Sequence, residues 1–166
     1  MDLYILRHAI AGDSESFNGP DSERPLTKDG AKKMKHIAEE LKKLKLRFDI
    51  ILTSPFLRAK ETAAIVAKEF HCENVLKFSS HLKVGGNPAA LINEINTTYK
   101  KFDNIVLVGH EPYLSALISM LISGKKDLSI TMKKGGICKL STASLVYGRC
   151  ATLEWLMAPA QVLKEN

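Results

Sequence analysis

At 166 residues, the chain has the length of one ordinary domain and can bury a substantial core. Hydrophobic residues make up 45% and charged residues 25% of the chain, a balance that is typical of a globular protein and excludes a disordered one. No apolar run approaches the roughly 20 residues that a membrane-spanning helix needs. The N-terminus carries an acidic residue at Asp2 and no cationic lead-in, unlike a signal peptide. We therefore expect one cytoplasmic domain over residues 1–166, with no membrane partner.

The formal net charge of +6 comes mainly from lysines in segments 28–45 and 125–139. No aromatic residues lie between these lysines to stack bases, so we expect no nucleic acid partner, although a positive surface favours an anionic substrate. The three cysteines, Cys72, Cys138 and Cys150, form no CxxC pair, and we expect them to be reduced, buried thiols. With no cluster of metal ligands in the sequence, we expect no metal and no cofactor.

Short apolar runs alternate along the chain with longer segments of helical period. Residues 3–6 are the first expected strand, and the polar segment 14–25 is an expected loop. Thr27 then caps a long helix. Its apolar residues form one stripe: Ala31, Met34, Ile37, Ala38, Leu41 and Leu44. A second strand is expected at 49–53, followed by a helix that starts at Pro55 with Ser54 as its cap.

The rest of the chain continues this alternation and then changes character. The expected elements are a strand at 75–78, a helix from Asn87 to about 99, a strand at 104–108, a helix from Pro112 to 122, and strands at 137–140 and 151–155. The pattern predicts an α/β fold, a single three-layer domain. Its central sheet is mainly parallel, with helices on both faces and an antiparallel C-terminal strand.

Two histidines stand at equivalent places in this pattern. His8 follows the first expected strand and His110 follows the strand at 104–108. Ligands of open α/β sheets bind beyond the carboxyl ends of the strands, so these side chains should converge there. Arg7, next to His8, and Arg58, one turn into the helix after the second strand, complete the set.

This set of side chains suits phosphoryl transfer. Guanidinium groups present paired N–H donors that match phosphate oxygens and stay charged at any working pH. A neutral imidazole is nucleophilic near pH 7, because its ordinary pKa is about 6.5. We therefore expect a phosphatase that does not depend on a metal, with positive charge supplied by arginines.

The same residues lie in motifs that resemble a known family. LRHA at 6–9, SPFLRAKET at 54–62 and VGHEP at 108–112 resemble the signatures of the histidine phosphatase (phosphoglycerate mutase-like) superfamily. RPLTKDG at 24–30 and LEWLMAP at 153–159 are similar to its SixA-type phosphohistidine phosphatase branch. The resemblance implies a covalent phospho-His8 intermediate. It also implies that Arg7, Arg58 and His110 bind the phosphoryl group and stabilise the transition state.

The sequence departs from the family pattern in two places. Ala9 replaces the glycine that usually follows the first histidine, which adds a methyl group and restricts the backbone. Mutases and phosphomonoesterases of the family have a carboxylate that protonates the leaving oxygen, whereas segment 79–91 contains no Asp or Glu. Phosphohistidine has a better leaving group than an alkyl ester and fits this absence. Glu111 is either the missing acid or a charge at a helix N-terminus, and His81 is either a proton donor or an exposed loop residue.

The resemblance and the missing acid together favour a phosphohistidine phosphatase that acts on a phosphorylated protein, such as a histidine-containing phosphorelay domain. The chain is too short for a large lid, which suits an open site and a large substrate. Arg24 either binds the substrate or pairs with a carboxylate such as Glu23. The alternatives are a small-molecule phosphomonoesterase of the same superfamily and a module that binds phosphoproteins without turnover. We expect a monomer.

Overall fold

The computed structural model describes residues 1–164 as a single α/β domain built on one six-stranded sheet. The strands are β1 (Asp2–Arg7), β2 (Ile50–Thr53), β3 (Leu76–Phe78), β4 (Asn104–Gly109), β5 (Ile137–Ser141) and β6 (Thr152–Met157). They lie in the order β3-β2-β4-β1-β5-β6. The first four are parallel, β5 pairs antiparallel with β1, and β6 pairs antiparallel with β5. The mainly parallel sheet is confirmed, and its antiparallel C-terminal part consists of two strands.

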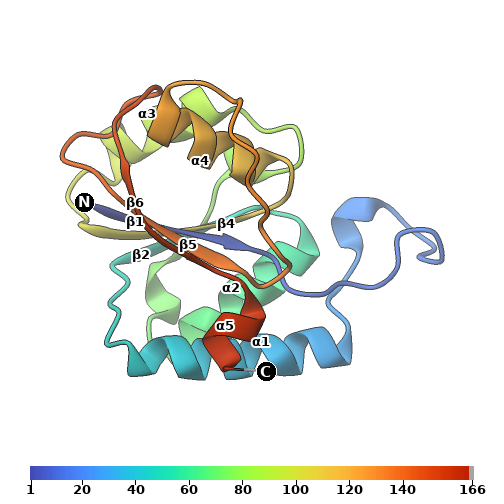
Figure 1. The fold of residues 1–166 in the computed structure, drawn as a ribbon. Helices are drawn as coiled ribbons and strands as arrows, with labels where there is room; N and C mark the ends of the chain where they lie inside the picture. The colour runs from blue at the N-terminus through green and yellow to red at the C-terminus, as the bar shows by residue number, and fades with distance from the viewer. Residues whose placement is uncertain (165–166) are drawn as a thin grey trace.

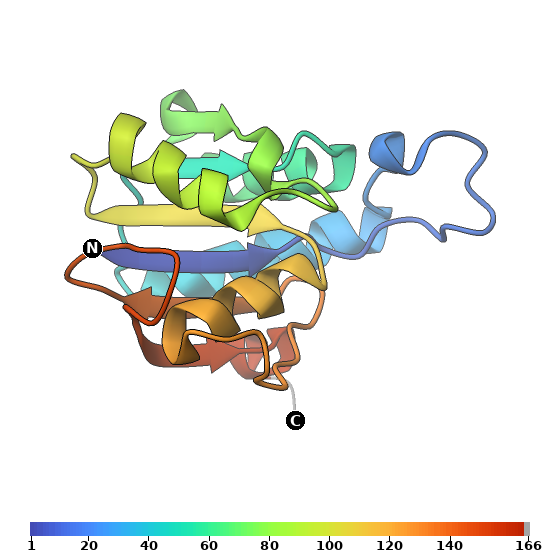
Figure 2. The ribbon, with the colours of Figure 1, turned by 90° about the horizontal axis from the view of Figure 1, so that it is seen from above.

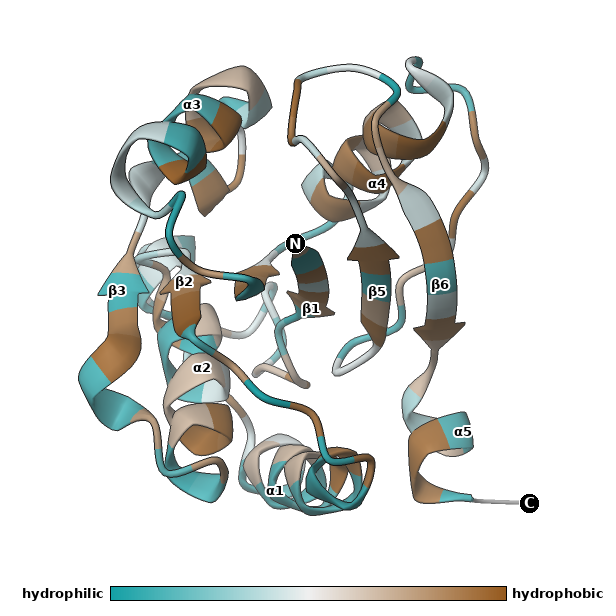
Figure 3. Ribbon diagram, turned by 90° about the vertical axis from the view of Figure 1, so that its left-hand side faces the viewer, coloured by the Kyte–Doolittle hydropathy of each residue, from teal (hydrophilic) through white to brown (hydrophobic). Residues whose placement is uncertain are grey.

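Five helices cover the two faces of the sheet (Figure 1). They are α1 (Lys28–Lys43), α2 (Leu57–Glu69), α3 (Pro88–Thr98), α4 (Tyr113–Ser123) and α5 (Pro159–Leu163). Helices α3 and α4 pack on one face, and α1, α2 and α5 pack on the other (Figure 3). The expected three layers are therefore present.

Alternate side chains of the central strands enter different cores, as the period of a strand requires. Leu3 and Ile5 of β1 pack with α3 and α4, whereas Tyr4 and Leu6 pack with α1, α2 and α5. The same alternation runs through β4, whose residues from Ile105 to Val108 are all buried. A parallel strand that is covered on both faces carries an unbroken hydrophobic run, which is why these strands are visible in the sequence.

The segment between β1 and α1 projects beyond one edge of the sheet (Figure 2). Its base is closed by an isolated antiparallel bridge between Ala11 and Leu26, and a 3₁₀ turn, Asp21–Glu23, lies within it. Thr27 caps α1 as predicted, accepting a hydrogen bond from the backbone N–H of Gly30. A Cβ at Gly30 would lie 2.1 Å from the carbonyl oxygen of Ile10, so only glycine permits this close approach.

Three expectations are wrong in detail. Helix α2 begins at Leu57 instead of Pro55, because Phe56 takes the N-cap position in an extended conformation and Ser54 bonds elsewhere. Of the three cysteines, only Cys138 is buried, and Cys72 and Cys150 are half-exposed because they lie outside the sheet. Helix α5 was not expected. Within residues 1–164, no helix is both long and apolar enough to cross a membrane.

Candidate active site

The carboxyl ends of β1, β4 and β2 bring the expected site residues together. In the register of the sheet, Arg7 lies opposite Gly109 and Thr53 lies opposite Val108. The backbone N–H of His8 continues the ladder by donating to the carbonyl of Gly109, at 3.0 Å. The residues that follow the three strands are therefore neighbours, although about fifty residues separate each from the next in the chain. Helix α1, which follows β1, packs on one face of the sheet, and α4, which follows β4, packs on the other. The segments after these two neighbouring strands therefore diverge at the carboxyl ends of the strands, where open α/β sheets bind ligands.

The ring of His8 is held in one orientation and one tautomer. Its Nδ1 lies 2.7 Å from the carbonyl oxygen of Ala9, which can only accept, so Nδ1 carries the proton. The lone pair is then on Nε2, and this atom accepts a hydrogen bond of 3.3 Å from Nε of Arg58. His8 thus presents the lone pair of Nε2 next to a guanidinium group.

Phe56 packs against both His110 and Arg58. The ring of Phe56 lies 5.1 Å from the His110 ring, centroid to centroid, and 5.2 Å from Cζ of Arg58. The His8 and His110 rings are also 5.1 Å apart. His110 Nε2 lies 2.8 Å from Oγ of Ser54, the residue that was expected to cap α2. The exposed fractions of His8, Arg58 and His110 are only 6%, 3% and 1%, so the cluster is fixed by packing as well as by hydrogen bonds.

Thr62 connects the loop after β1 to helix α2. Its hydroxyl donates to the carbonyl of Arg58 at 2.7 Å and accepts from the backbone N–H of Ala9 at 3.0 Å. Ala9 is buried in the same core as α1 and α2, where its methyl group packs in place of the usual glycine hydrogen. The backbone of Ala9 still bonds both to the ring of His8, through its carbonyl, and to Thr62, through its N–H.

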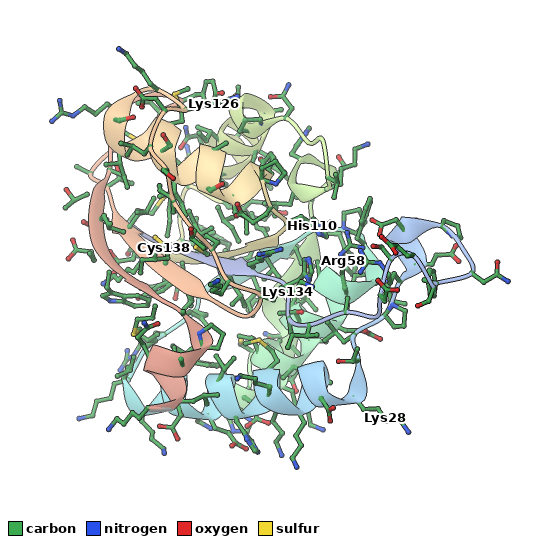
Figure 4. All side chains as sticks on the ribbon, turned by 45° about the vertical axis from the view of Figure 1, so that its right-hand side comes forward. Lys28, Arg58, His110, Lys126, Lys134 and Cys138 are labelled. Atoms are coloured by element: carbon green, nitrogen blue, oxygen red, sulfur yellow. The ribbon has the colours of Figure 1, made fainter. Side chains whose placement is uncertain are left out.

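Arg7 completes the cluster, which we call the arginine–histidine cradle: Arg7, His8, Arg58 and His110. Nη1 of Arg7 donates to the carbonyl of Met132 at 2.7 Å, and its buried Nε has no protein partner among the described residues. Nδ1 of His110 is likewise buried without a partner within residues 1–164. Figure 4 shows Arg58 and His110 at the edge of the sheet that faces the loop between β1 and α1. Buried donors of this kind are suited to an oxyanion.

A carboxylate that sequence reasoning missed also reaches the cradle. Asp21, in the 3₁₀ turn, accepts a hydrogen bond of 2.9 Å from Nη2 of Arg58 through Oδ2, and its carbonyl accepts one of 2.7 Å from Nη1. Its Oδ1 accepts from Nε and Nη2 of Arg24 at 2.9 and 2.6 Å. Partial burial raises the pKa of Asp21, but the bonds from the two arginines more than offset this and hold the pKa below its ordinary value. The ion-pair partner of Arg24 is therefore Asp21 and not Glu23, because the turn aims Asp21 at both arginines.

Both imidazoles are neutral at physiological pH. Burial, together with the charges of Arg58, Arg7 and Lys134, lowers the pKa of His8 to about 4, against the opposing effect of its hydrogen bond to Ala9. Burial also lowers the pKa of His110 to about 3, with smaller contributions from His8 and the arginines. A neutral His8 is the nucleophilic form.

The side chains that could protonate a leaving group are engaged elsewhere or lie away from the cradle. Glu111 precedes the cis peptide bond to Pro112 and accepts from both the backbone N–H and the hydroxyl of Ser115, at 3.1 and 2.6 Å, so its carboxylate is held at the first turn of α4. In the outer part of the sheet, Glu94 of α3 accepts from Oγ of Ser79 at 2.5 Å. Among the described residues, no hydrogen bond or ion pair joins His81 to the cradle, and no three His, Cys, Asp or Glu side chains are grouped to hold a metal ion.

The chain is similar in sequence to known proteins. The model of the histidine phosphatase superfamily (branch 1) matches residues 3–79. An uncharacterized protein of Picosynechococcus sp. is 32% identical over 87% of both chains. The phosphohistidine phosphatase SixA of Escherichia coli is 24% identical over 98% of this chain and 96% of its own.

Solved structures extend the likeness to three dimensions. A structure of the protein histidine phosphatase SixA complexed with tungstate has a TM-score of 0.82 and 25% identity, covering 98% of this chain and 99% of its own. A mycobacterial glucosyl-3-phosphoglycerate phosphatase has a TM-score of 0.70 and 16% identity, covering 95% and 99%. The latter shows the fold alone. With the strand-end histidines, the buried Arg58 and these matches in view, the chain belongs to the histidine phosphatase superfamily, branch 1.

Proposed function

We propose that this protein is a phosphohistidine phosphatase, which removes the phosphoryl group from a phosphorylated protein through a covalent phospho-His8 intermediate. The observation that carries the proposal is the locked, neutral His8, whose Nε2 faces the guanidinium group of Arg58. All of residues 1–166 act as one catalytic domain. The similarity to SixA and the absence of an acid in segment 79–91 support phosphohistidine as the substrate.

The reaction has two displacements at phosphorus. Nε2 of His8 attacks in line, and the bond from phosphorus to the substrate's imidazole breaks as the P–N bond to His8 forms. With its other ring nitrogen protonated, the substrate's imidazole departs as a neutral molecule and needs no acid from the enzyme. Water then attacks phospho-His8, releasing inorganic phosphate and restoring His8.

The remaining cradle residues stabilise charge. Arg7 and Arg58 neutralise the equatorial oxygens, and His110 contacts the phosphoryl group through its unpartnered Nδ1. Arg24 acts at the substrate side by holding Asp21 and the projecting loop. The charge comes from side chains, so we propose that catalysis is independent of metals and cofactors. A reducing, cytoplasmic location is supported by three cysteines without disulfides in the described chain.

A small-molecule phosphomonoesterase is the second candidate. The same fold carries a glucosyl-3-phosphoglycerate phosphatase, and Glu111 lies beside His110 in sequence. An ester would require Glu111 to leave Ser115 and protonate the leaving oxygen. The third candidate is a module that binds phosphoproteins without turnover. The presence of His8 together with Arg7 and Arg58 argues against it.

One assay separates these candidates. A phosphohistidine protein, a phosphoramidate and a panel of alkyl phosphate monoesters are compared at neutral pH in excess EDTA. We expect kcat/KM for the first two to exceed that for alkyl esters by at least about a hundredfold, because general acid catalysis is typically worth about 10²–10⁴-fold. p-Nitrophenyl phosphate, which has a good leaving group, should fall between them.

Two variants provide the controls. His8→Ala should abolish turnover of every substrate, and Glu111→Gln should leave phosphohistidine hydrolysis nearly unchanged. If alkyl esters are cleaved as fast as phosphohistidine and Glu111→Gln stops them, the enzyme is a phosphomonoesterase. A reversible, stoichiometric metal requirement would contradict the metal-independent reaction.

A further inference from the structure

A pocket of about 370 Å³ adjoins the cradle on the side of α1 and α5. It lies between α1, the residues that follow β1, the turn that precedes β5 and the start of α5. Its floor includes Ala9, Met34 and Ile37, all of them buried. Four cationic residues line it, namely Arg7, Lys33, Lys133 and Lys134, whereas the described residues that line it include no carboxylate.

Lys133 and Lys134 lie on a turn whose backbone is hydrogen-bonded to the end of β1 and to His8. The backbone N–H of Gly135 donates to the carbonyls of both Arg7 and His8 at 3.1 Å, and the N–H of Arg7 donates to Gly136 at 3.1 Å. Gly135 has a φ of +78°, and a Cβ there would lie 3.2 Å from Cδ1 of Ile37. The turn therefore fixes the backbone of two exposed lysines beside the cradle. Figure 4 shows Lys134 at the same edge of the sheet as Arg58 and His110.

The cradle and the pocket share Arg7, and the charge of Lys134 acts on His8. A substrate bound in the cradle therefore extends over the pocket if it is larger than a phosphoryl group. An apolar floor with a cationic rim is complementary to an apolar side chain that is flanked by acidic ones. No aromatic residue among those described lines the pocket, so stacking of bases is not available.

We propose that this pocket docks an acidic segment of the substrate protein, adjacent to its phosphohistidine, with one apolar side chain on the floor and carboxylates at Lys133 and Lys134. The inference rests on the proposed function, because it assumes that the phosphoryl group arrives on a polypeptide. It assigns to this chain a preference among phosphoproteins that the cradle alone does not supply, since the cradle contacts only the phosphoryl group.

Binding of unphosphorylated peptides tests the docking site without any turnover. The probes are a histidine peptide whose flanking Leu is surrounded by Glu, the same peptide with Lys for Glu, and one with Ser for Leu. At low salt, we expect the acidic peptide to bind at least about tenfold more tightly than the basic one. The Ser peptide should be weaker than its Leu parent, and added salt should reduce the preference.

Charge reversal on the protein supplies matched variants. Lys133→Glu should lower the affinity for the acidic peptide about tenfold. Lys100→Glu makes the same charge change at an exposed site between α3 and β4, at the amino end of β4 and so away from the cradle. This variant should leave the affinity for the acidic peptide unchanged. Equal affinity for the acidic and basic peptides, or equal effects of the two variants, would overturn the docking site.

Turnover of the phosphorylated peptides separates this proposal from the proposed function. The ratio of kcat/KM for the acidic phosphopeptide to that for phosphoramidate should fall about tenfold in Lys133→Glu and stay constant in Lys100→Glu. Hydrolysis of all substrates without a preference for the acidic peptide would overturn docking and leave the phosphatase in place. Selective binding without hydrolysis would support docking and overturn the phosphatase.

Discussion

His8 shows how the fold fixes the charge and the orientation of a single side chain, as the proposed nucleophilic attack requires. An isolated imidazole, with a pKa of about 6.5, is partly protonated near neutral pH. Burial and neighbouring cations remove that protonated fraction, and the carbonyl of Ala9 fixes the remaining proton on Nδ1. The ring is therefore neutral, oriented and adjacent to the positive charge that attracts a phosphoryl group, before any substrate is bound.

This arrangement predicts the titration of the two rings. In nuclear magnetic resonance spectra of the free protein, the His8 and His110 rings should remain neutral as the pH falls to 5.5, because their pKa values are about 4 and about 3. The Cε1–H resonances are assigned by their loss in His8→Asn and His110→Gln. A midpoint above about 6 for His8, close to that of a free imidazole, would contradict the proposed electrostatics of the site.

At the scale of elements, the projecting segment between β1 and α1 places a competing anion at the cradle. The carboxylate of Asp21 holds the Nη2 atoms of Arg24 and Arg58, so in the proposed reaction it competes with the phosphoryl group for the charge of Arg58. The segment is tied at its base, where Arg24 donates to the carbonyl of Gly12 and Glu61 accepts from the N–H of Leu26. The competition is therefore local to the turn that carries Asp21.

Asp21→Asn should strengthen the binding of inorganic phosphate. The change keeps the size of the side chain and removes its charge, so Arg58 loses a rival anion whose pairing contributes on the order of 1 kcal/mol, or about fivefold in affinity. The inhibition constant for phosphate measures this effect. Glu23→Gln, in the same turn but without a bond to either arginine among the described contacts, is the matched control. Weaker phosphate binding in Asp21→Asn would mean that the carboxylate serves mainly to position Arg58.

The elements also show what the sequence could predict. The strands and the helices α1 to α4 follow from hydrophobic period, with capping residues that were correct for α1 and α3, and the strand ends placed His8 and His110 together. Ser54 was misassigned because its partner, His110, lies 56 residues away. Asp21 was missed for the same reason, since Arg58 is 37 residues distant and the loop has no periodic pattern. Helix α5 has five residues, too few to show a period, and the pocket that it borders was missed with it.

At the scale of the whole molecule, folding keeps His8 and His110 neutral, so protonation of these two histidines at low pH favours the unfolded state. The folded protein does not protonate His8 or His110 until the pH approaches about 4 and about 3, respectively. The unfolded chain takes up both protons near pH 6.5. Between these values the unfolded state binds more protons, so the free energy of unfolding falls as the pH is lowered. The slope is roughly 1.4 kcal/mol per pH unit for each histidine.

Urea unfolding at several pH values tests this linkage. Between pH 7 and pH 5, the wild-type protein should lose on the order of 4 kcal/mol, a large part of the roughly 5–15 kcal/mol typical of a domain. Asp21, whose pKa is lowered on folding, contributes stability that is lost only below its unfolded value of about 3.9, outside this window. The double variant His8→Asn/His110→Gln removes both titrating groups and should have a nearly flat profile over the same range, whatever its absolute stability. If wild type and double variant lost the same free energy, the acid sensitivity would have another source, and neither imidazole would be held neutral by the fold.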